Sequence, residues 1–276
     1  MQASKELLAD AFNSLAGALA SVERRPYLDL FASYYPPDAP RIADAGVSNM
    51  ASHLGSRIAP GELVSVYGDH LGPREGAWGR FDAQGRVRTE LSGVSVWFNG
   101  IPAPILYASS QRIDAVTPAG LGGAGKASIE VAYEGKKSAP LSVDLGPSAP
   151  GLFTVSGNGR GYAVAVNGDG TLNSEQRPAR KGSWITLFGT GLGLLETGLT
   201  DGAGVHDARP HPGHGIRIRI DGIDSQVSYA GGSPGTIAGL WQLNLRVPDE
   251  VSSGMKPIQV EVDGNRGRET VYLQIQ

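Results

Sequence analysis

PGELVSVYGDHLG at residues 60–72 returns as KGSWITLFGTGLG at residues 181–193, so that Gly61 corresponds to Gly182, 121 positions later. A second block, GVSVWFNGI at residues 93–101, returns as GIRIRIDGI at residues 215–223 with an offset of 122. Short periods indicate solenoids or propellers, whereas this long one indicates two copies of a whole domain. The repeat therefore predicts the architecture of the chain more directly than it predicts a function.

The composition agrees with an all-β protein of two domains. The chain has 276 residues, and its 40 glycines and 18 prolines lie at intervals between short apolar runs, which is typical of many strands joined by tight turns. The net charge of −3 arises from interspersed residues of both signs, so no basic face for nucleic acid is expected. The absence of cysteine excludes disulfides, thiolate metal sites and a cysteine nucleophile. No apolar run is long enough to span a bilayer.

Each copy is expected to contain about six or seven short strands. The strands expected in the first copy lie at residues 63–67, 94–98, 105–107, 112–117, 127–133 and 141–145. Those expected in the second lie at residues 184–188, 216–220, 226–229, 240–247, 257–262 and 270–275. This spacing predicts two tandem immunoglobulin-like β-sandwiches, at residues 41–147 and 148–276. Two prolines in the linker at residues 146–151 favour a preferred angle between them.

An N-terminal α-helical segment is expected at residues 1–40. Within residues 4–23, apolar side chains recur at intervals of four and three and form one stripe, made of Leu8, Phe12, Leu15, Leu19 and Val22. Such a helix is marginal in water by itself, so the stripe should pack either on the first sandwich or on another subunit. Polar residues interrupt the apolar run, and no signal peptide is expected.

Several motifs together are similar to one known family. They are AGVSNMAS at residues 45–52, IAPGELVSVYG at residues 58–68, the run NGIPAP at residues 99–104, SAPGLF at residues 148–153, GTGLG at residues 189–193 and AGLWQLN at residues 238–244. Residues 42–276 resemble a tandem immunoglobulin-like domain family, related to the IPT/TIG type, that is abundant in Acidobacteria of the Solibacter group. The resemblance implies a C-terminal part of an exported bacterial protein, located outside the cell or in the cell envelope, without an assigned biochemical role.

The repeat also sorts the tryptophans. Trp97 aligns with Arg219, which alternates with isoleucines, so Trp97 should face away from the core. An outward tryptophan needs a cover, which the N-terminal helix, a partner protein or a sugar ring would supply. Trp184 aligns with Leu63, and Trp241 has the parity of apolar neighbours, so both are expected in the core.

One loop gathers candidate metal ligands. His206, His211, His214 and Asp207 lie close together in the sequence, and imidazole and carboxylate groups suit zinc, copper or nickel. Their spacing matches no established metal motif, so a solvated loop is the simpler interpretation. Residues 167–173, NGDGTLN, alternate oxygen ligands as calcium loops do, but they lack the sixth-position glycine and the distal glutamate. No cofactor is expected.

No combination of acid, base and nucleophile stands out, so a non-enzymatic protein is expected. The leading hypothesis is a structural or interaction protein that self-assembles, or binds a protein partner, through the N-terminal stripe, Trp97 and exposed sandwich faces. One alternative is a carbohydrate-binding module that uses surface aromatics. Another is a metal-dependent hydrolase built on the histidine loop.

Overall fold

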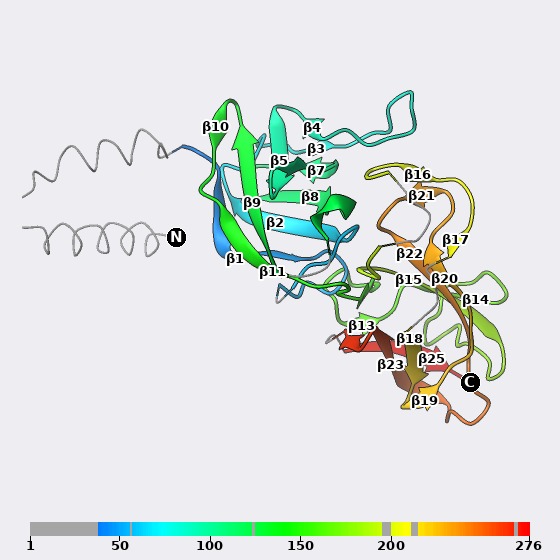
Figure 1. The fold of residues 1–276 in the computed structure, drawn as a ribbon. Coiled ribbons are helices and arrows are strands. Elements are labelled where there is room, and N and C mark those ends of the chain that lie inside the picture. The colour runs from blue at the N-terminus through cyan, green and yellow to red at the C-terminus, as the bar shows by residue number, and fades with distance from the viewer. Residues whose placement is uncertain (1–37, 56, 123–124, 195–199, 211–214, 268–269) are drawn as a thin grey trace, which may run out of the picture. The chain divides into compact units, whose positions relative to one another are not determined.

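A computed structural model describes residues 38–276, except residues 56, 123–124, 195–199, 211–214 and 268–269 (Figure 1). The expected N-terminal helix, with the stripe from Leu8 to Val22, lies outside the described residues. Residues Pro40–Gln276 form one compact unit, which contains both sandwiches. No helix among the described residues is long and apolar enough to cross a membrane.

The first sandwich has two sheets. One has the order β1-β2-β8-β7-β3, from β1 (Arg41–Asn49), β2 (Leu63–Asp69), β8 (Arg112–Val116), β7 (Ile105–Ala108) and β3 (Ala77–Trp78). The other has the order β10-β9-β5-β4, from β10 (Lys136–Lys137), β9 (Gly125–Tyr133), β5 (Val94–Phe98) and β4 (Glu90–Leu91). In that sheet β11 (Leu141–Leu145) also pairs with β9, and β6 (Ile101–Pro102) pairs with β5. A short 3-10 helix, η1 (Ala119–Leu121), follows β8.

The second sandwich is built in the same way. One sheet has the order β12-β15-β22-β20-β17, with β14 also on β15, from β12 (Gly151–Leu152), β14 (Ala165–Asn167), β15 (Trp184–Thr190), β17 (Arg209–Pro210), β20 (Val227–Gly232) and β22 (Trp241–Arg246). The other has the order β13-β25-β23-β18-β19, with β24 on β23, from β13 (Gly161–Tyr162), β18 (Ile216–Ile220), β19 (Ile223–Asp224), β23 (Gly254–Val262), β24 (Asn265–Arg266) and β25 (Val271–Ile275). A separate ribbon joins β16 (Gly204–Val205) to β21 (Thr236–Ile237).

Both sandwiches have the immunoglobulin strand order. In the first, β1-β2-β8-β7 and β5-β9-β11 correspond to the A-B-E-D and C-F-G sheets of a constant-type domain. In the second, β15-β22-β20 and β18-β23-β25 take the corresponding places, and β12 and β14 share the position of the first strand. The prediction of a mainly β protein with immunoglobulin-like sandwiches is therefore confirmed within residues 40–276.

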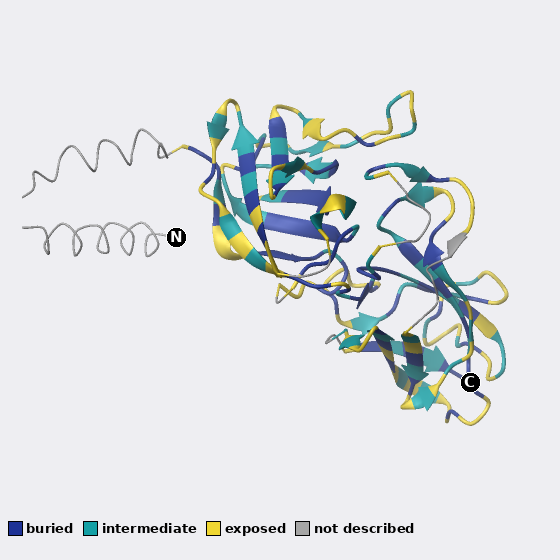
Figure 2. Ribbon diagram, in the orientation of Figure 1, coloured by how far each residue is buried: buried dark blue, intermediate teal, exposed yellow. Residues whose placement is uncertain are grey.

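Buried and exposed residues alternate along the strands, so the hydrophobic core of each sandwich lies between its two sheets. On β5, Val94, Val96 and Phe98 are buried and the residues between them are partly exposed. On β18, Ile218 and Ile220 are buried in the core of the second sandwich. Figure 2 shows this banding of buried and exposed residues along the strands. The strict alternation fixes the register, because a slip by one residue would turn every apolar side chain outward.

The repeat extends to a cross-strand polar pair, which is buried in the first copy and partly buried in the second. Ser65 on β2 donates a hydrogen bond to Asp114 Oδ1 on β8 at 2.7 Å. At the corresponding place, Thr186 on β15 donates to Asn244 Oδ1 on β22 at 3.0 Å. Each pair joins directly opposite residues of neighbouring strands. The two copies therefore share a cross-strand contact that their different residue types conceal in the sequence.

The first strand is the place where the copies differ most in backbone. Residues 43–46 form an irregularity between the two paired parts of β1. In the second copy, residues 153–164 separate β12 from β14, which pair with the matching ends of β15. The longer segment contributes β13, which pairs in parallel with β25. An insertion thus divides one strand in two without changing the sandwich.

Trp184 was expected in the core, and that prediction is wrong. Its side chain is 41% exposed, whereas Leu63, its counterpart in the first copy, is 2% exposed. The difference comes from the second sandwich, because Leu63 lies against Gly239 and its N–H donates to Thr190 Oγ1 at 2.8 Å. The first copy is covered at this point by the second, whereas the described residues leave Trp184 without such a cover. Trp241 is 3% exposed, as expected.

Buried hydrogen bonds join the two sandwiches. The Thr190 hydroxyl accepts from Leu63 N–H and donates to the Gly239 carbonyl at 2.7 Å. Asn49 Nδ2 donates to the Ala149 carbonyl of the linker at 2.9 Å and to Glu62 Oε1 at 2.7 Å. Leu63, Asn49, Glu62 and Thr190 are all buried. Buried groups satisfied by partners in the other domain hold the two domains in one arrangement.

A second contact joins the parts of the two copies that differ in sequence. Residues 73–92 and 194–214 occupy the same place between the matched blocks. Arg86 forms a β-bridge with Ala203. Val87 N–H donates to the Gly202 carbonyl and Gly204 N–H donates to the Gly85 carbonyl, both at 2.9 Å. Residues 85–87 and 202–204, one stretch from each divergent segment, therefore pair across the junction.

Exchanging the two repeat-equivalent residues tests the cover over Leu63. We expect Leu63→Trp to lower the free energy of unfolding by about 1–3 kcal/mol, because the larger ring has no space at the enclosed site. We expect Trp184→Leu to change it by about 1 kcal/mol or less, because that position is partly exposed. Urea denaturation of both variants measures the difference. Equal losses would contradict the assignment of Leu63 to the junction.

The junction also contains a buried acid whose titration is measurable. Burial raises the pKa of Glu62 from 4.5 to about 8, against the opposing hydrogen bonds from Ala59 N–H and Asn49. Between these two values the folded chain keeps a proton that the unfolded chain has lost, so stability should fall as pH rises, by at most about 1.4 kcal/mol per pH unit. We expect Glu62→Gln to remove this part of the pH dependence in urea titrations between pH 5 and pH 8. The exposed Glu250→Gln is the matched control, and an unchanged slope in Glu62→Gln would contradict the assignment.

Candidate functional site

Trp97 lies where the alternation of β5 predicts, facing away from the core. It is partly exposed, and the Lys137 ammonium lies 5.1 Å from the centre of its ring. Its cross-strand neighbours are Pro102 and Glu130. A lysine from β10, on the far side of β9 in the same sheet, thus supplies part of the cover that this ring needs, through a cation–π contact.

The proposed metal ligands fall partly outside the described residues. His211 and His214 lie in the segment that is not described, whereas His206 and Asp207 are described and exposed. The His206 ring lies near Gly85 and Gly204, beside the pairing of residues 85–87 with residues 202–204. Within the described part of the chain, no group of three or more His, Asp or Glu side chains is placed to hold a metal ion.

The loop at residues 167–173 uses its oxygen atoms internally. Asp169 accepts hydrogen bonds from the N–H and the hydroxyl of Thr171 at 3.0 and 2.7 Å, and the hydroxyl contact is the main reason that its pKa is lowered. Asn167 Oδ1 accepts from Asn173 Nδ2 at 3.1 Å. These contacts form a hydrogen-bonded turn, which accounts for the residues that suggested calcium.

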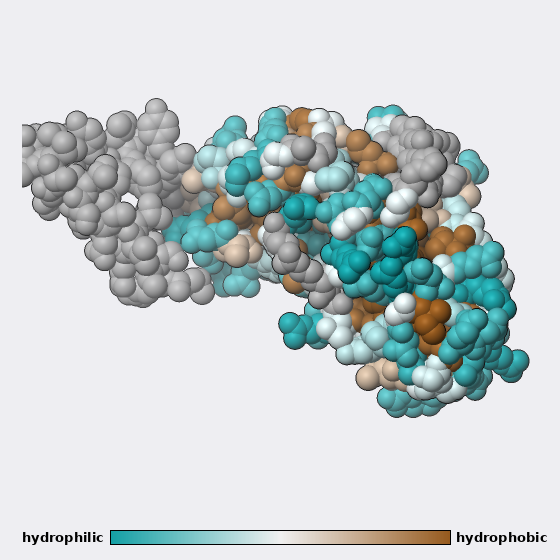
Figure 3. All heavy atoms as spheres, turned by 60° about the horizontal axis from the view of Figure 1, so that its bottom comes forward, coloured by the Kyte–Doolittle hydropathy of each residue, from teal (hydrophilic) through white to brown (hydrophobic). Residues whose placement is uncertain are grey.

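The first sandwich carries a groove with exposed aromatic rings, here called the aromatic groove. Its volume is about 360 Å³. Trp78 is 69% exposed and Phe81 is 51% exposed. Four charged side chains line the groove beside them: Arg80, Asp82, Arg88 and Glu90. Scattered apolar residues are normal on a protein surface, and the face drawn in Figure 3 shows small apolar patches among hydrophilic residues. Two exposed aromatic side chains in one groove are therefore the more informative feature.

A stack of side chains supports Trp78 from the core outward. The Trp78 and Tyr107 rings lie 4.7 Å apart between centres, inclined by 55°. The Arg112 guanidinium lies 4.8 Å from the centre of the Tyr107 ring, and its Nε is 3.5 Å from the carboxylate of Asp114. Burial raises the pKa of Asp114, which the Ser65 hydroxyl and the Arg112 charge oppose. Trp78 is thus held in place although most of its surface is exposed.

Glycines allow the segment before the groove to lie close to β7. A Cβ atom on Gly79 would overlap the Ile105 carbonyl oxygen, and Gly79 N–H donates to the Leu106 carbonyl at 2.8 Å. A Cβ atom on Gly76, which has a φ of +74°, would overlap the Tyr107 hydroxyl. Only glycine at both places lets Trp78 pair with Tyr107 across the two strands.

The far wall of the groove is a hairpin that reaches the second sandwich. Phe81 forms a bridge with Val87. Asp82 Oδ1 accepts from the N–H groups of Gln84 and Arg86 at 2.9 and 3.0 Å, which stabilises the turn between them. Because Arg86 in turn forms a bridge with Ala203, the contact between the two sandwiches also holds this side of the groove.

The aromatic groove was not predicted from the sequence. Residues 73–92 have no matching sequence in the second copy, and this was the available signal. Trp78 and Phe81 lie there in a glycine-containing stretch without strand alternation. Two aromatic residues in such a stretch indicate a binding surface more directly than Trp97 does. Strand alternation already explains why Trp97 faces outward, so its exposure needs no functional reason.

No family model matches the chain, and no curated protein matches it. Among solved structures, the Bacteroides ovatus mixed-linkage glucan utilization locus protein SGBP-B, in complex with a mixed-linkage heptasaccharide, is similar with a TM-score of 0.36 and 13% identity over 87% of this chain. The chain spans 46% of the length of that protein. The titin immunoglobulin tandem A164-A165 is similar with a TM-score of 0.24 and 12% identity over 80% of this chain and 92% of that one. These likenesses concern the fold alone.

The close approach at Gly79 can be tested directly. We expect Gly79→Ala to lower the free energy of unfolding by about 1–3 kcal/mol, because the added methyl group meets backbone that cannot move aside cheaply. It should also weaken the near-ultraviolet circular dichroism of the Trp78–Tyr107 contact. Gly204→Ala is the control, since the nearest atom to its added Cβ lies at 3.6 Å. Equal behaviour of the two variants would contradict the proposed role of Gly79.

Proposed function

We propose that this chain is a non-enzymatic binding module and that the aromatic groove of its first sandwich binds a neutral carbohydrate. The observation that carries the proposal is Trp78, which is 69% exposed yet packed against Tyr107, with the two ring centres 4.7 Å apart. An ordered and exposed aromatic ring is costly to leave uncovered by a ligand. Its rigidity lowers the entropy that binding must overcome.

The charges around the rings favour a ligand that is polar but uncharged. Arg80 and Arg88 are hydrogen-bond donors, and Asp82 and Glu90 are acceptors, so the four formal charges cancel. A sugar ring presents an apolar face together with hydroxyl groups that both donate and accept. The groove offers aromatic surface for the first and both kinds of polar partner for the second.

Two further parts of the proposal rest on the sequence. A location outside the cell or in the cell envelope is supported by the resemblance of residues 42–276 to exported bacterial domains. A role without catalysis is supported by the use of Asp82, whose Oδ1 is engaged by the N–H groups of its own turn. A carboxylate used in this way stabilises the shape of the groove, which is what a binding site requires.

A protein partner, including a second copy of the chain, is the second candidate. It is favoured by the kinds of residue in the stack, since tryptophan, tyrosine and arginine are the types that dominate the energetics of protein interfaces. Trp78, Tyr107 and Arg112 lie together in the first sandwich. Self-association through the predicted N-terminal stripe belongs to the same candidate.

Affinity electrophoresis in gels containing neutral polysaccharides tests the carbohydrate proposal. We expect at least one gel among xylan, mannan, starch and mixed-linkage glucan to retard the chain. Trp78→Ala should weaken that retardation by about tenfold or more, because it removes the main aromatic contact. Trp184→Ala, which removes a partly exposed tryptophan from the other sandwich, is the matched control and should behave as wild type.

Two outcomes would decide against carbohydrate. If no polysaccharide retards the chain, or if Trp78→Ala and Trp184→Ala lose retardation equally, the groove is not a sugar site. Light scattering of the same variants then tests one form of the second candidate, an association of copies through Trp78, which Trp78→Ala should abolish.

A further inference from the structure

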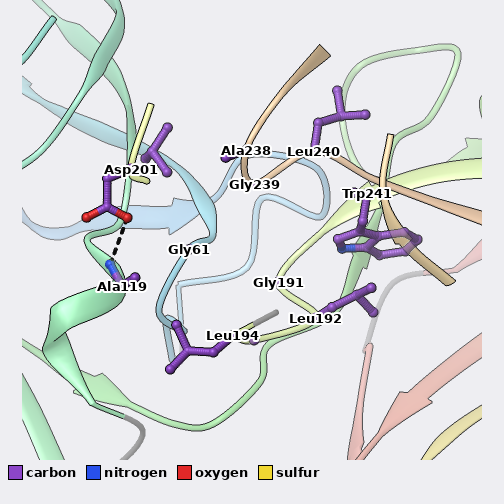
Figure 4. Close-up of a pocket in the computed structure, with 13 residues that line it drawn as sticks. Gly61, Ala119, Gly191, Leu192, Leu194, Asp201, Ala238, Gly239, Leu240 and Trp241 are labelled. Atoms are coloured by element: carbon purple, nitrogen blue, oxygen red, sulfur yellow. Dashed lines mark hydrogen bonds between the residues drawn. The ribbon is translucent and has the colours of Figure 1, made fainter. Parts of the chain in front are cut away.

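A pocket of about 300 Å³ lies at the junction of the two sandwiches, here called the junction pocket (Figure 4). Val116 and Ala119 line it from the first sandwich, and Leu192, Asp201, Leu240 and Trp241 line it from the second. It shares no lining residue with the aromatic groove. Its volume is at the lower end of the range for sites that bind small molecules.

The hydrogen bonds of the junction hold the pocket open in one shape. Gly61 and Gly239 lie on opposite domains and both line it. The Thr190 hydroxyl donates to the Gly239 carbonyl and accepts from the N–H of Leu63, which lies two residues after Gly61 in the chain. Because Thr190 and Leu63 are buried, these walls are part of the domain contact. A pocket with fixed walls requires little reorganisation when a ligand enters.

One carboxylate lies in these otherwise apolar walls. Asp201 is partly buried, and its Oδ1 accepts from Ala119 N–H at 3.0 Å (Figure 4). No ion pair to it is found in the described part of the chain. Burial raises its pKa, and the single backbone hydrogen bond opposes this only in part. A carboxylate in such surroundings is stabilised by a cation that also brings apolar surface.

The indole N–H of Trp241, a residue that lines the pocket, has no hydrogen-bond partner among the described residues. Trp241 is 3% exposed. In Figure 4 the nitrogen lies on the edge of the ring that is turned toward Gly191, another lining residue. Buried N–H groups without a partner are rare and call for an explanation, and the lining role of this ring makes it a reporter for anything that enters.

We propose that the junction pocket binds a small organic amine, whose ammonium group pairs with Asp201 and whose apolar body lies against Leu192, Leu240 and Trp241. An ammonium group supplies the missing positive charge and further hydrogen-bond donors. The leucine and tryptophan side chains exclude water from the rest of the ligand. This site is separate from the aromatic groove, so either proposal stands or fails without the other.

Titration of the full chain with 2-phenylethylamine, followed by ¹⁵N NMR, tests the proposal. We expect saturable shifts of the indole N–H signal that is absent from Trp241→Phe. Asp201→Asn should weaken binding by about tenfold or more, because it removes the charge while its amide oxygen can still accept from Ala119 N–H. Asp207→Asn changes an exposed carboxylate outside the pocket and should bind as wild type. The neutral 2-phenylethanol should bind about tenfold more weakly than the amine.

Three results would overturn the proposal: an absence of saturable shifts, equal affinity in Asp201→Asn and Asp207→Asn, or equal binding of the amine and the alcohol. If Asp201→Asn fails to fold, Ala238→Leu provides the second variant. Ala238 lines the pocket, so the added methyl groups should occupy it and abolish the shifts. Shifts that persist in a folded Ala238→Leu would place the amine elsewhere and overturn the assignment.

Discussion

The hydroxyl of Thr190 is the contact on which the arrangement of the two sandwiches depends. It accepts a hydrogen bond from Leu63 N–H of the first domain and donates one to the Gly239 carbonyl of the second. Thr190 and Leu63 are both buried, so separating the domains would leave backbone groups to find other partners, at a cost of about 1–3 kcal/mol for each one left unsatisfied. Leu63, the buried Glu62 beside it in the chain and two glycines of the junction pocket, Gly61 and Gly239, all lie around this contact.

The divergent segments add a second link and give the first sandwich its distinctive surface. Residues 73–92 carry Trp78 and Phe81, and residues 194–214 carry three of the five histidines. They meet at the bridge between Arg86 and Ala203. Segments that differ between the copies thus add to the contact that the matched blocks make through Leu63 and Thr190. A duplicated domain needs such differences, because identical surfaces would not distinguish the inner face of the pair from its outer faces.

Much of each sandwich could be predicted from local pattern. Alternation on β5 and β18 identified the buried residues and placed Trp97 outward, because strand geometry sends neighbouring side chains to opposite faces. The repeat matched β2 with β15 and β5 with β18. The cross-strand pairs Ser65–Asp114 and Thr186–Asn244 could not be predicted, since they join strands whose register is set by folding.

The candidate sites were harder to predict, for physical reasons that differ from residue to residue. Trp184 was placed in the core because Leu63 is apolar and aligned with it, but the burial of Leu63 comes from the second sandwich and not from strand alternation. Trp78 was overlooked because it lies in a stretch without periodicity, where only pairing with β7 and stacking on Tyr107 give it a position. Asp201 and Trp241 lie in different segments of the chain and line one pocket only after the domains have packed.

The sequence by itself determined what depends on neighbours along the chain: two copies, short strands, their turns and the inward or outward side of each strand residue. Tertiary structure decided what depends on one copy covering the other: which of two equivalent apolar residues is buried, where a carboxyl group loses its water, and where a pocket remains between domains. The reason is that strand geometry is repeated with the sequence, whereas the contact between the copies occurs only once and has no counterpart from which it could be inferred.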